Sequence, residues 1–267
     1  MSGCVLVDCG GFRLAAEVSG APEGAPWLVL SNSLGASRAM WAPQLAWLGR
    51  RFRVLGYDQR GHGESDAPAG PYGFDYLTGD VIALMDHFGV ETASFMGLSL
   101  GGMTGLGLAL RHPSRFDRIV CCDARADAPP AYVQGWTDRI AAVRDGGMAT
   151  ILAGTMERWF VPQTRDAQPD LMAAMHAMFT ATSPDGYIGC AEALKRLDYL
   201  KDLPGLSIPT LYVVGDSDLA APPAAMRAMA EATPGSRYAE IPGAAHLANI
   251  DNPAAFASAV GPFLGLA

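Results

Sequence analysis

The stretch Gly97-Leu98-Ser99-Leu100-Gly101-Gly102 decides the fold of this chain of 267 residues. The apolar run 92–96 before it has the length of a buried strand, and the segment 103–111 after it, rich in Leu, Ala and Gly, indicates a buried helix. The glycines allow strand and helix to cross closely, and the tight turn between them forces a strained backbone at Ser99. Such a turn holds the serine hydroxyl out above the sheet, so we predict that Ser99 is a nucleophile.

The composition indicates a globular protein with a large apolar core, because 50% of the residues are hydrophobic and 17% are charged. The length fits one α/β domain with a large insertion. A formal net charge of −8 argues against a nucleic-acid partner and against binding to anionic membranes. The sequence shows no signal peptide and no apolar stretch near the roughly 18 residues of a membrane span, so we expect a cytoplasmic protein.

The cysteines indicate neither a metal site nor a disulfide framework. Their number, five, is odd, and their spacing fits neither kind of site. They are Cys4, Cys9, Cys121, Cys122 and Cys190. We therefore expect no bound metal and no organic cofactor.

Strands alternate with helices on both sides of the nucleophile turn, which predicts a parallel sheet covered by helices on both faces. Expected strands are 5–8, 12–18, 27–30, 53–57, 119–122, 210–214 and 237–241, and expected helices are 41–48, 75–88, 224–232 and 253–264. Between 128 and 203 the pattern changes to helices alone, with helical stretches at 151–160, 171–179 and 191–200. This segment is predicted to be a helical cap over the carboxyl ends of the strands, inserted into a core formed by 1–127 and 204–267.

A serine hydroxyl needs a base to become a nucleophile, and the base needs an acid to orient it. Of the five histidines, His246 alone follows both the serine and a late strand, so it is the predicted base. The acid is predicted to be Asp218, which closes the run Gly215-Asp216-Ser217-Asp218 after the strand 210–214. Asp216 is an alternative, and so is Asp123 at the end of an earlier strand.

Acyl transfer also needs hydrogen-bond donors for the oxyanion of the tetrahedral intermediate. We predict the backbone N–H of Leu100, which follows the nucleophile, and that of Leu34 in the loop Ser31-Asn32-Ser33-Leu34-Gly35. The side chain of Asn32 is expected to brace this loop. The other distinctive stretch, 58–65, is interpreted as a structural loop whose charged side chains Asp58, Arg60 and His62 bond one another.

Three motifs identify the chain as a member of the α/β-hydrolase family: the stretch 58–65, the stretch 97–102, and 215–218 together with His246. Within the family the chain resembles the 3-oxoadipate enol-lactonases almost from end to end. Matching residues in the cap are Trp136, Arg139-Ile140, Gly147-Met148, Arg158-Trp159-Phe160 and Gly186-Tyr187-Ile188-Gly189-Cys190. The resemblance implies a mostly parallel eight-stranded sheet with helices on both faces and an inserted helical cap.

The resemblance also implies a serine hydrolase of aromatic catabolism that opens 3-oxoadipate enol-lactone through an acyl-enzyme. The carboxylate of such a small-molecule substrate must be paired when it is buried, so an acidic protein needs a local cation for it. Trp136, Arg139 and Arg125 are the predicted substrate-binding residues; the cap also carries Arg144, Arg158 and Arg165. The alternatives are a general carboxylesterase, a carbon–carbon bond hydrolase, and a binding protein that uses a hydrolase pocket without catalysis.

Overall fold

The computed structural model describes residues 3–266 and places the nucleophile turn at the centre of an eight-stranded sheet. Two strands, β5 (Ala93–Leu98) and β7 (Thr210–Gly215), are buried at every residue, because both faces of the sheet are covered there. The other strands are β1 (Val5–Asp8), β2 (Arg13–Gly20), β3 (Trp27–Ser31), β4 (Arg53–Tyr57), β6 (Phe116–Cys122) and β8 (Arg237–Ile241).

The strand order is β1-β2-β4-β3-β5-β6-β7-β8, in which β2 pairs antiparallel with both β1 and β4 and all other pairs are parallel. This confirms the prediction of a mostly parallel eight-stranded sheet. The register aligns the carboxyl ends of the inner strands: Ser31 lies opposite Gly97, and Leu98 lies opposite Cys122. The loops that follow β3, β5, β6, β7 and β8 therefore meet at one edge of the sheet.

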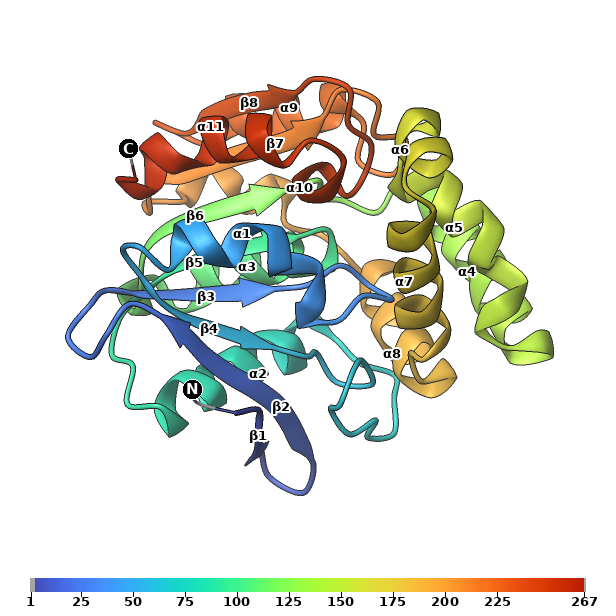
Figure 1. Ribbon diagram of the computed structural model, residues 1–267, viewed down its shortest axis with the longest axis horizontal. Helices are drawn as coiled ribbons and strands as arrows, with labels where there is room; N and C mark the ends of the chain where they lie inside the picture. The colour runs from blue at the N-terminus through green and yellow to red at the C-terminus, as the bar shows by residue number, and fades with distance from the viewer. Residues whose placement is uncertain (1–2, 267) are drawn as a thin grey trace.

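Helices cover both faces of the sheet, as expected (Figure 1). On one face lie α1 (Ala42–Leu48) and α11 (Pro253–Leu264), and on the other lie α2 (Phe74–His87) and α3 (Leu100–Arg111). The core also includes α9 (Pro223–Ala232), α10 (Ala248–Asp251) and the 3₁₀ segments η1 (Arg38–Trp41) and η2 (Pro113–Arg115). Helix α3 begins directly after Ser99, three residues earlier than the sequence pattern indicates.

Between β6 and β7 the chain forms a group of helices at the edge toward which the parallel strands point (Figure 1). They are α4 (Pro130–Gly146), α5 (Leu152–Trp159), α6 (Pro162–Ala167), α7 (Pro169–Thr180) and α8 (Pro184–Leu194), with the 3₁₀ segments η3 (Met148–Ile151) and η4 (Leu200–Gly205). We call this group the cap. The division into a cap of 128–203 and a core of 1–127 and 204–267 remains a prediction.

One cap helix lies elsewhere than the sequence pattern indicates. The pattern predicts a helix over 191–200, but α8 begins at Pro184 and ends at Leu194. Ser183 caps its first turn, because the Ser183 side chain accepts a hydrogen bond of 3.3 Å from the Gly186 N–H. After the helix, Asp198 pairs with Asp127 in an isolated bridge, and the Tyr199 N–H donates to the Ala126 carbonyl at 2.7 Å.

Candidate active site

Ser99 sits on the turn between β5 and α3 with φ +57° and ψ −116°, a conformation that non-glycine residues rarely adopt. The turn is fixed from both sides: the Ser99 N–H donates to the Cys122 carbonyl at 2.8 Å, and the Gly101 N–H donates to the Asn32 carbonyl at 3.0 Å. The residue is 8% exposed, at the floor of a cavity below the cap. A strained serine in this position is typical of an activated nucleophile.

The glycines on either side of Ser99 are required by close backbone contacts. A Cβ at position 97 would lie 2.2 Å from the Gly101 carbonyl oxygen, and one at position 101 would lie 2.3 Å from the Ser31 carbonyl oxygen. Real Cβ atoms do not approach backbone this closely. The spacing of glycines in the motif therefore follows from the crossing of strand and helix.

His246, in the loop between β8 and α10, lines the same cavity as Ser99. Its Nδ1 atom lies 2.8 Å from Oδ2 of Asp218, and both side chains are buried. The other carboxylate oxygen of Asp218 accepts hydrogen bonds from the N–H groups of Ala220, at 2.7 Å, and Ala221, at 3.1 Å. These bonds fix the carboxylate so that it can orient the imidazole of His246.

The other two candidate acids have different partners. The carboxylate of Asp216 accepts hydrogen bonds from the N–H groups of Gly243, at 2.9 Å, and Ala244, at 3.3 Å, so it ties the β7 loop to the histidine loop. Asp123, at the end of β6, is fully buried and accepts a 2.8 Å hydrogen bond from the Gly215 N–H. Burial, and then the nearby charge of Asp218, raise the pKa of the Asp123 carboxyl well above its usual range. Asp218 is therefore the candidate whose carboxylate is hydrogen-bonded to His246.

The loop after β3 brings the predicted oxyanion donor, the Leu34 N–H, to the cavity that Ser99 also lines. Its neighbours are already engaged: the Ser33 N–H donates to Sδ of Met40 at 3.3 Å, and the Gly35 N–H donates to Nε2 of His62 at 2.9 Å. Asn32 braces the loop, since its side-chain amide donates to the Tyr57 carbonyl at 3.1 Å. Across the described residues 3–266, the backbone N–H groups of Leu34 and Leu100 have no acceptor within hydrogen-bonding distance.

The cavity has a volume of about 40 Å³, room for only a few water molecules. Its lower wall comes from the core and its upper wall from α4, α5 and α8. The residues that line it are Ser33, Leu34, Ser99, Met103, Asp123, Tyr132, Trp136, Arg139, Thr155, Arg158, Trp159, Tyr187, Ala220, Ala221 and His246. Two of the three predicted substrate-binding residues, Trp136 and Arg139, are among them.

The third, Arg125, does not line the cavity. Its guanidinium pairs with the carboxylate of Asp127 at 3.0 Å and lies 5.2 Å from the centre of the Tyr132 ring. An arginine two residues from an aspartate on the exit from β6 finds a local partner, which keeps it away from the site.

Arg158 lines the cavity in addition to Arg139, and the sequence pattern alone does not single it out. Its backbone carbonyl accepts a 3.3 Å hydrogen bond from the His246 N–H, which holds α5 against the histidine loop. Burial, and then the positive charge of Arg139, lower the pKa of Arg158. Arg139 itself donates to Oγ1 of Thr155 at 2.7 Å. Across residues 3–266, neither of these cavity arginines has a carboxylate within ion-pair distance.

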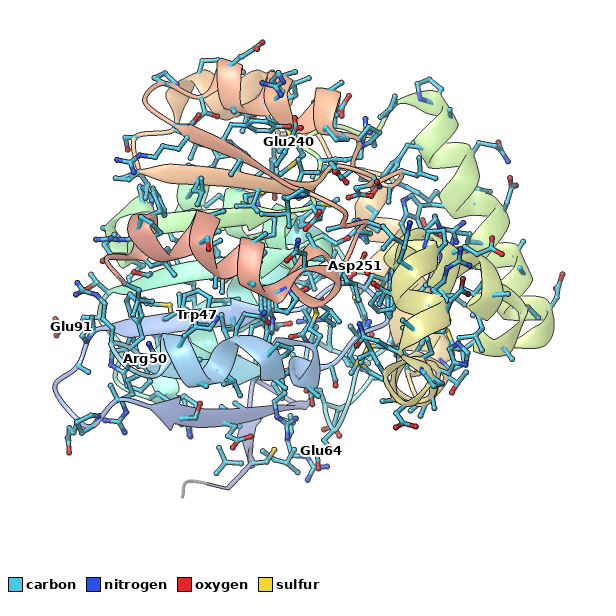
Figure 2. All side chains as sticks on the ribbon, turned by 45° about the horizontal axis from the view of Figure 1, so that its top comes forward. Trp47, Arg50, Glu64, Glu91, Glu240 and Asp251 are labelled. Atoms are coloured by element: carbon cyan, nitrogen blue, oxygen red, sulfur yellow. The ribbon has the colours of Figure 1, made fainter. Side chains whose placement is uncertain are left out.

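Asp251 provides a second connection between the cap and the histidine loop. Figure 2 shows it at the junction of the C-terminal helices and the cap. One carboxylate oxygen accepts hydrogen bonds from the N–H groups of Ala245, at 2.8 Å, and Val161, at 3.2 Å. The position of His246 therefore depends on the docking of the cap.

The charged side chains of the stretch 58–65 have their main partners outside it, so the expectation that they bond one another is wrong. The carboxylate of Asp58 pairs with Arg38, and the Arg60 guanidinium binds both carboxylate oxygens of Asp80, at 2.7 and 2.5 Å. The imidazole of His62 accepts the hydrogen bond from the Gly35 N–H. The stretch thus connects the cavity loop to the rest of the core.

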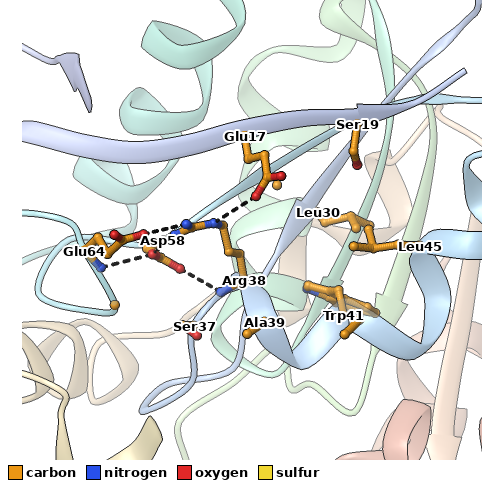
Figure 3. Close-up of a pocket in the computed structure, with 13 residues that line it drawn as sticks. Glu17, Ser19, Leu30, Ser37, Arg38, Ala39, Trp41, Leu45, Asp58 and Glu64 are labelled. Carbon is orange, nitrogen blue, oxygen red and sulfur yellow. Dashed lines mark hydrogen bonds and ion pairs between the residues drawn. The ribbon is translucent and has the colours of Figure 1, made fainter. Parts of the chain in front are cut away.

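A larger cavity, of about 340 Å³, opens between β2 and α1 (Figure 3). Its charged groups are paired with one another, because Arg38 contacts Asp58, Glu64 and Glu17. None of the side chains of Ser99, His246 and Asp218 lines it. We therefore place the candidate active site in the smaller cavity.

Two kinds of feature are absent from the described range 3–266. No helix there has the length and apolarity to cross a membrane. No group of three or more His, Cys, Asp and Glu side chains in that range is arranged to hold a metal ion.

A protein-family model described as the alpha/beta hydrolase fold matches residues 26–253. The chain is 37% identical to 3-oxoadipate enol-lactonase 2 of Acinetobacter baylyi, over 88% of this chain and 87% of that protein. It is 35% identical to 3-oxoadipate enol-lactonase 1 of the same organism, over 92% and 91%. The crystal structure of the enol-lactonase from Burkholderia xenovorans LB400 superimposes with a TM-score of 0.94 at 40% identity, covering 98% of this chain and 100% of that one.

Proposed function

The chain belongs to the alpha/beta hydrolase family and is a hydrolase, and we propose that it opens 3-oxoadipate enol-lactone through a serine acyl-enzyme. The observation that carries the mechanism is the cavity in which strained Ser99 faces the histidine loop, with Asp218 bonded to His246 at 2.8 Å. The similarity to 3-oxoadipate enol-lactonases supports the choice of substrate.

The first step forms the acyl-enzyme. The Oγ atom of Ser99 attacks the lactone carbonyl carbon while Nε2 of His246 takes the hydroxyl proton. Asp218, bonded to Nδ1, keeps the imidazole in the tautomer that can accept this proton and stabilises the imidazolium that forms. The N–H groups of Leu34 and Leu100, which are free of other acceptors among residues 3–266, receive the negative charge on the carbonyl oxygen.

Collapse of the tetrahedral intermediate breaks the ring carbon–oxygen bond. The leaving group is an enolate, which takes the proton from His246 and becomes the keto group of the product. Water then attacks the acyl-enzyme, giving its proton to His246, and Ser99 recovers a proton as the acid leaves. Each step uses the same serine, histidine and donor pair.

The substrate carboxylate is proposed to bind between Arg139 and Arg158. Both line the cavity, and among residues 3–266 neither has a carboxylate partner. Two guanidinium groups without a carboxylate partner in a buried cavity favour an anionic ligand, because the ligand supplies the negative charge that pairs with them. The cavity is smaller than a six-carbon lactone, so the half-buried side chains of Trp136 and Arg139 on α4 must move as it binds.

The test compares the lactone acid with its methyl ester. Wild-type kcat/KM should be about 10²-fold or more higher for the acid, since the ester leaves a buried cation unpaired. Arg139→Leu and Arg158→Leu should lose this preference. Arg125→Leu is the matched control: it removes an arginine already paired with Asp127 outside the cavity, and it should keep the preference.

Ser99→Ala supplies the mechanistic control and should reduce kcat by about 10⁴-fold or more. Equal efficiency on acid and ester, or preference for neutral p-nitrophenyl esters, would reject the enol-lactonase assignment in favour of a general carboxylesterase. Faster cleavage of a vinylogous diketone would favour a carbon–carbon bond hydrolase. Ligand binding without an acylation burst would indicate a non-catalytic binding protein.

A further inference from the structure

His62 is a buried titratable residue that the mechanism above does not use. It is 1% exposed and lies in the turn of the stretch 58–65. Its Nε2 atom accepts a 2.9 Å hydrogen bond from the Gly35 N–H, in the peptide that directly follows Leu34. Its Nδ1 atom lies 3.0 Å from the Arg60 carbonyl oxygen. The imidazole thus connects the cavity loop to the core.

We propose that His62 is a positioning residue, whose imidazole holds the peptide Leu34–Gly35 so that the Leu34 N–H points at the oxyanion. This inference rests on the proposed serine mechanism and on Leu34 as a donor. His62 touches neither the substrate nor the reacting atoms; it acts through the backbone of the loop.

The assignment of hydrogen-bond roles on the ring follows from its two partners. A backbone N–H donates to Nε2, so that nitrogen must be unprotonated, and the proton is on Nδ1, which donates to the Arg60 carbonyl. This requires the neutral imidazole. Burial lowers the pKa of His62 to about 4, which keeps the ring neutral near pH 7.

The Gly35 peptide cannot easily find another acceptor. Gly35 has φ +85°, and a Cβ there would lie 2.6 Å from the ring of Phe179 on α7, so the cap closes one side. Its carbonyl oxygen accepts a 3.4 Å hydrogen bond from the hydroxyl of Thr182. Without the imidazole, the Gly35 N–H would be buried and unsatisfied, and the loop would shift to relieve that cost. The Leu34 N–H lies on the adjoining Ser33–Leu34 peptide, so it would lose its fixed direction as the loop shifts.

The position of the imidazole is itself fixed by buried groups. The carbonyl of Arg60 accepts the hydrogen bond from Nδ1–H of His62, and the Arg60 guanidinium is held by both carboxylate oxygens of Asp80. The carbonyl of Gly61, which directly precedes His62, accepts a 3.0 Å hydrogen bond from the Ser183 N–H of the cap. The ring therefore has little freedom, as positioning of a catalytic donor requires.

Three variants separate positioning from folding. His62→Leu has no acceptor for the Gly35 N–H. His62→Asn keeps an amide near Nδ1, where it can bond the Arg60 carbonyl, but it is too short to reach Gly35. Both should lower kcat on the lactone by about 10²-fold, the typical cost of losing one oxyanion donor, with KM changed by less than about threefold. His62→Gln places an amide oxygen near the Nε2 position and should recover kcat to within about tenfold of wild type.

The control variant is Tyr212→Phe, which removes one buried hydrogen bond of 2.8 Å, to Thr233, from a strand that does not line the cavity. It should lose stability in urea and keep kcat. Affinity for a boronic acid, which forms a tetrahedral adduct on Ser99, should fall with kcat in His62→Leu and His62→Asn and return in His62→Gln.

The outcomes distinguish this inference from the proposed function. If Ser99→Ala is inactive while His62→Asn is folded and has wild-type kcat, the positioning role is wrong and the serine mechanism stands. A kcat for His62→Gln as low as that of His62→Asn would also overturn the role. Wild-type turnover by Ser99→Ala would reject the mechanism itself.

Discussion

Two non-glycine residues in the described part of the chain have a strained backbone conformation. Among residues 3–266, Ser99 and Asp123 are the non-glycine residues with positive φ, at +57° and +47°. They follow neighbouring strands and line the same cavity. Strain of this kind persists where the surrounding structure enforces it, and it concentrates at functional sites. At Ser99 it holds the proposed nucleophile on the turn between β5 and α3. At Asp123 it accompanies a buried carboxylate that accepts a hydrogen bond from the Gly215 N–H.

The proposed role of Asp218 as the acid that orients His246 can be tested by replacing each candidate aspartate with asparagine. Asp218→Asn should lower kcat by about 10³- to 10⁴-fold, because an amide can favour the wrong tautomer of His246. Asp216→Asn should stay within about tenfold, since the carboxylate of Asp216 binds the backbone N–H groups of Gly243 and Ala244 and an amide oxygen keeps one of these two bonds. Asp123→Asn should also be nearly silent, because an amide oxygen can still accept the hydrogen bond from the Gly215 N–H. A larger loss at Asp216 or Asp123 than at Asp218 would reassign the role.

Sequence spacing is enough to bring Ser99, Asp218 and His246 together, because each lies in the turn or loop that follows a strand, and a parallel sheet gathers such positions at one edge. Sequence spacing does not show which of the cap arginines line the cavity. Arg158 faces the cavity and Arg125 does not, which depends on how α5 docks on the histidine loop and on a local pair with Asp127. Neither feature leaves a periodic signal in the sequence.

At the scale of elements, the cap rests on the core through a contact between two glycines. A Cβ on Gly186, in the first turns of α8, would lie 2.3 Å from Cα of Gly61 and 2.9 Å from its carbonyl oxygen. Gly61 precedes His62, so the same contact that docks the helix also positions the loop beside the cavity. The two backbones approach so closely that neither Gly61 nor Gly186 can carry a side chain without a shift of the helix or the loop.

Gly186→Ala should therefore destabilise the protein by about 1–3 kcal/mol, the usual cost of forcing packed elements apart, and should lower kcat/KM. Gly135→Ala is the matched control, a glycine of helix α4 at which a Cβ would have no neighbouring atom within 4 Å. It should stabilise the protein by about 0.5–1 kcal/mol, because alanine favours the helix. The free energy of unfolding in urea measures both. Equal effects of the two substitutions would show that the Gly61–Gly186 contact does not carry the docking.

This contact also explains why the sequence pattern misplaces α8. The periodic Leu194, Leu197 and Leu200 suggest a helix over 191–200, and glycines at 186 and 189 argue against one earlier. In the fold, both glycines meet close neighbours: Gly61 at 186, and the ring of Tyr72 at 189, where a Cβ would lie 2.5 Å away. These partners are distant in sequence, so tertiary packing overrides the local propensity.

At the scale of the whole molecule, core and cap share one continuous set of buried apolar residues. The cluster runs from Val7 on the first strand through Phe95 on the central strand to Ile140, Phe160 and Phe179 of the cap. A cap that buries its apolar side against the core gains stability only when both are folded.

We therefore expect a single cooperative unfolding transition. Far-UV circular dichroism reports on the whole chain, and the fluorescence difference between wild type and Trp136→Phe reports on α4. The two urea curves should share one midpoint. A fluorescence transition at lower urea than the circular dichroism would mean that the cap unfolds separately.

The small size of the cavity also bears on which molecule could complete the proposed reaction. The cavity has only about 40 Å³ free before ligand binds, so if the cap closes again over an acyl chain on Ser99, it would leave space only for a very small second reactant. Water would fit in such a closed cavity, and a longer alcohol or an amine with a side chain would not. The chain would thus make free acid even in a medium rich in competing alcohols. Its fidelity as a hydrolase, rather than an acyltransferase, would come from the packing of the cap.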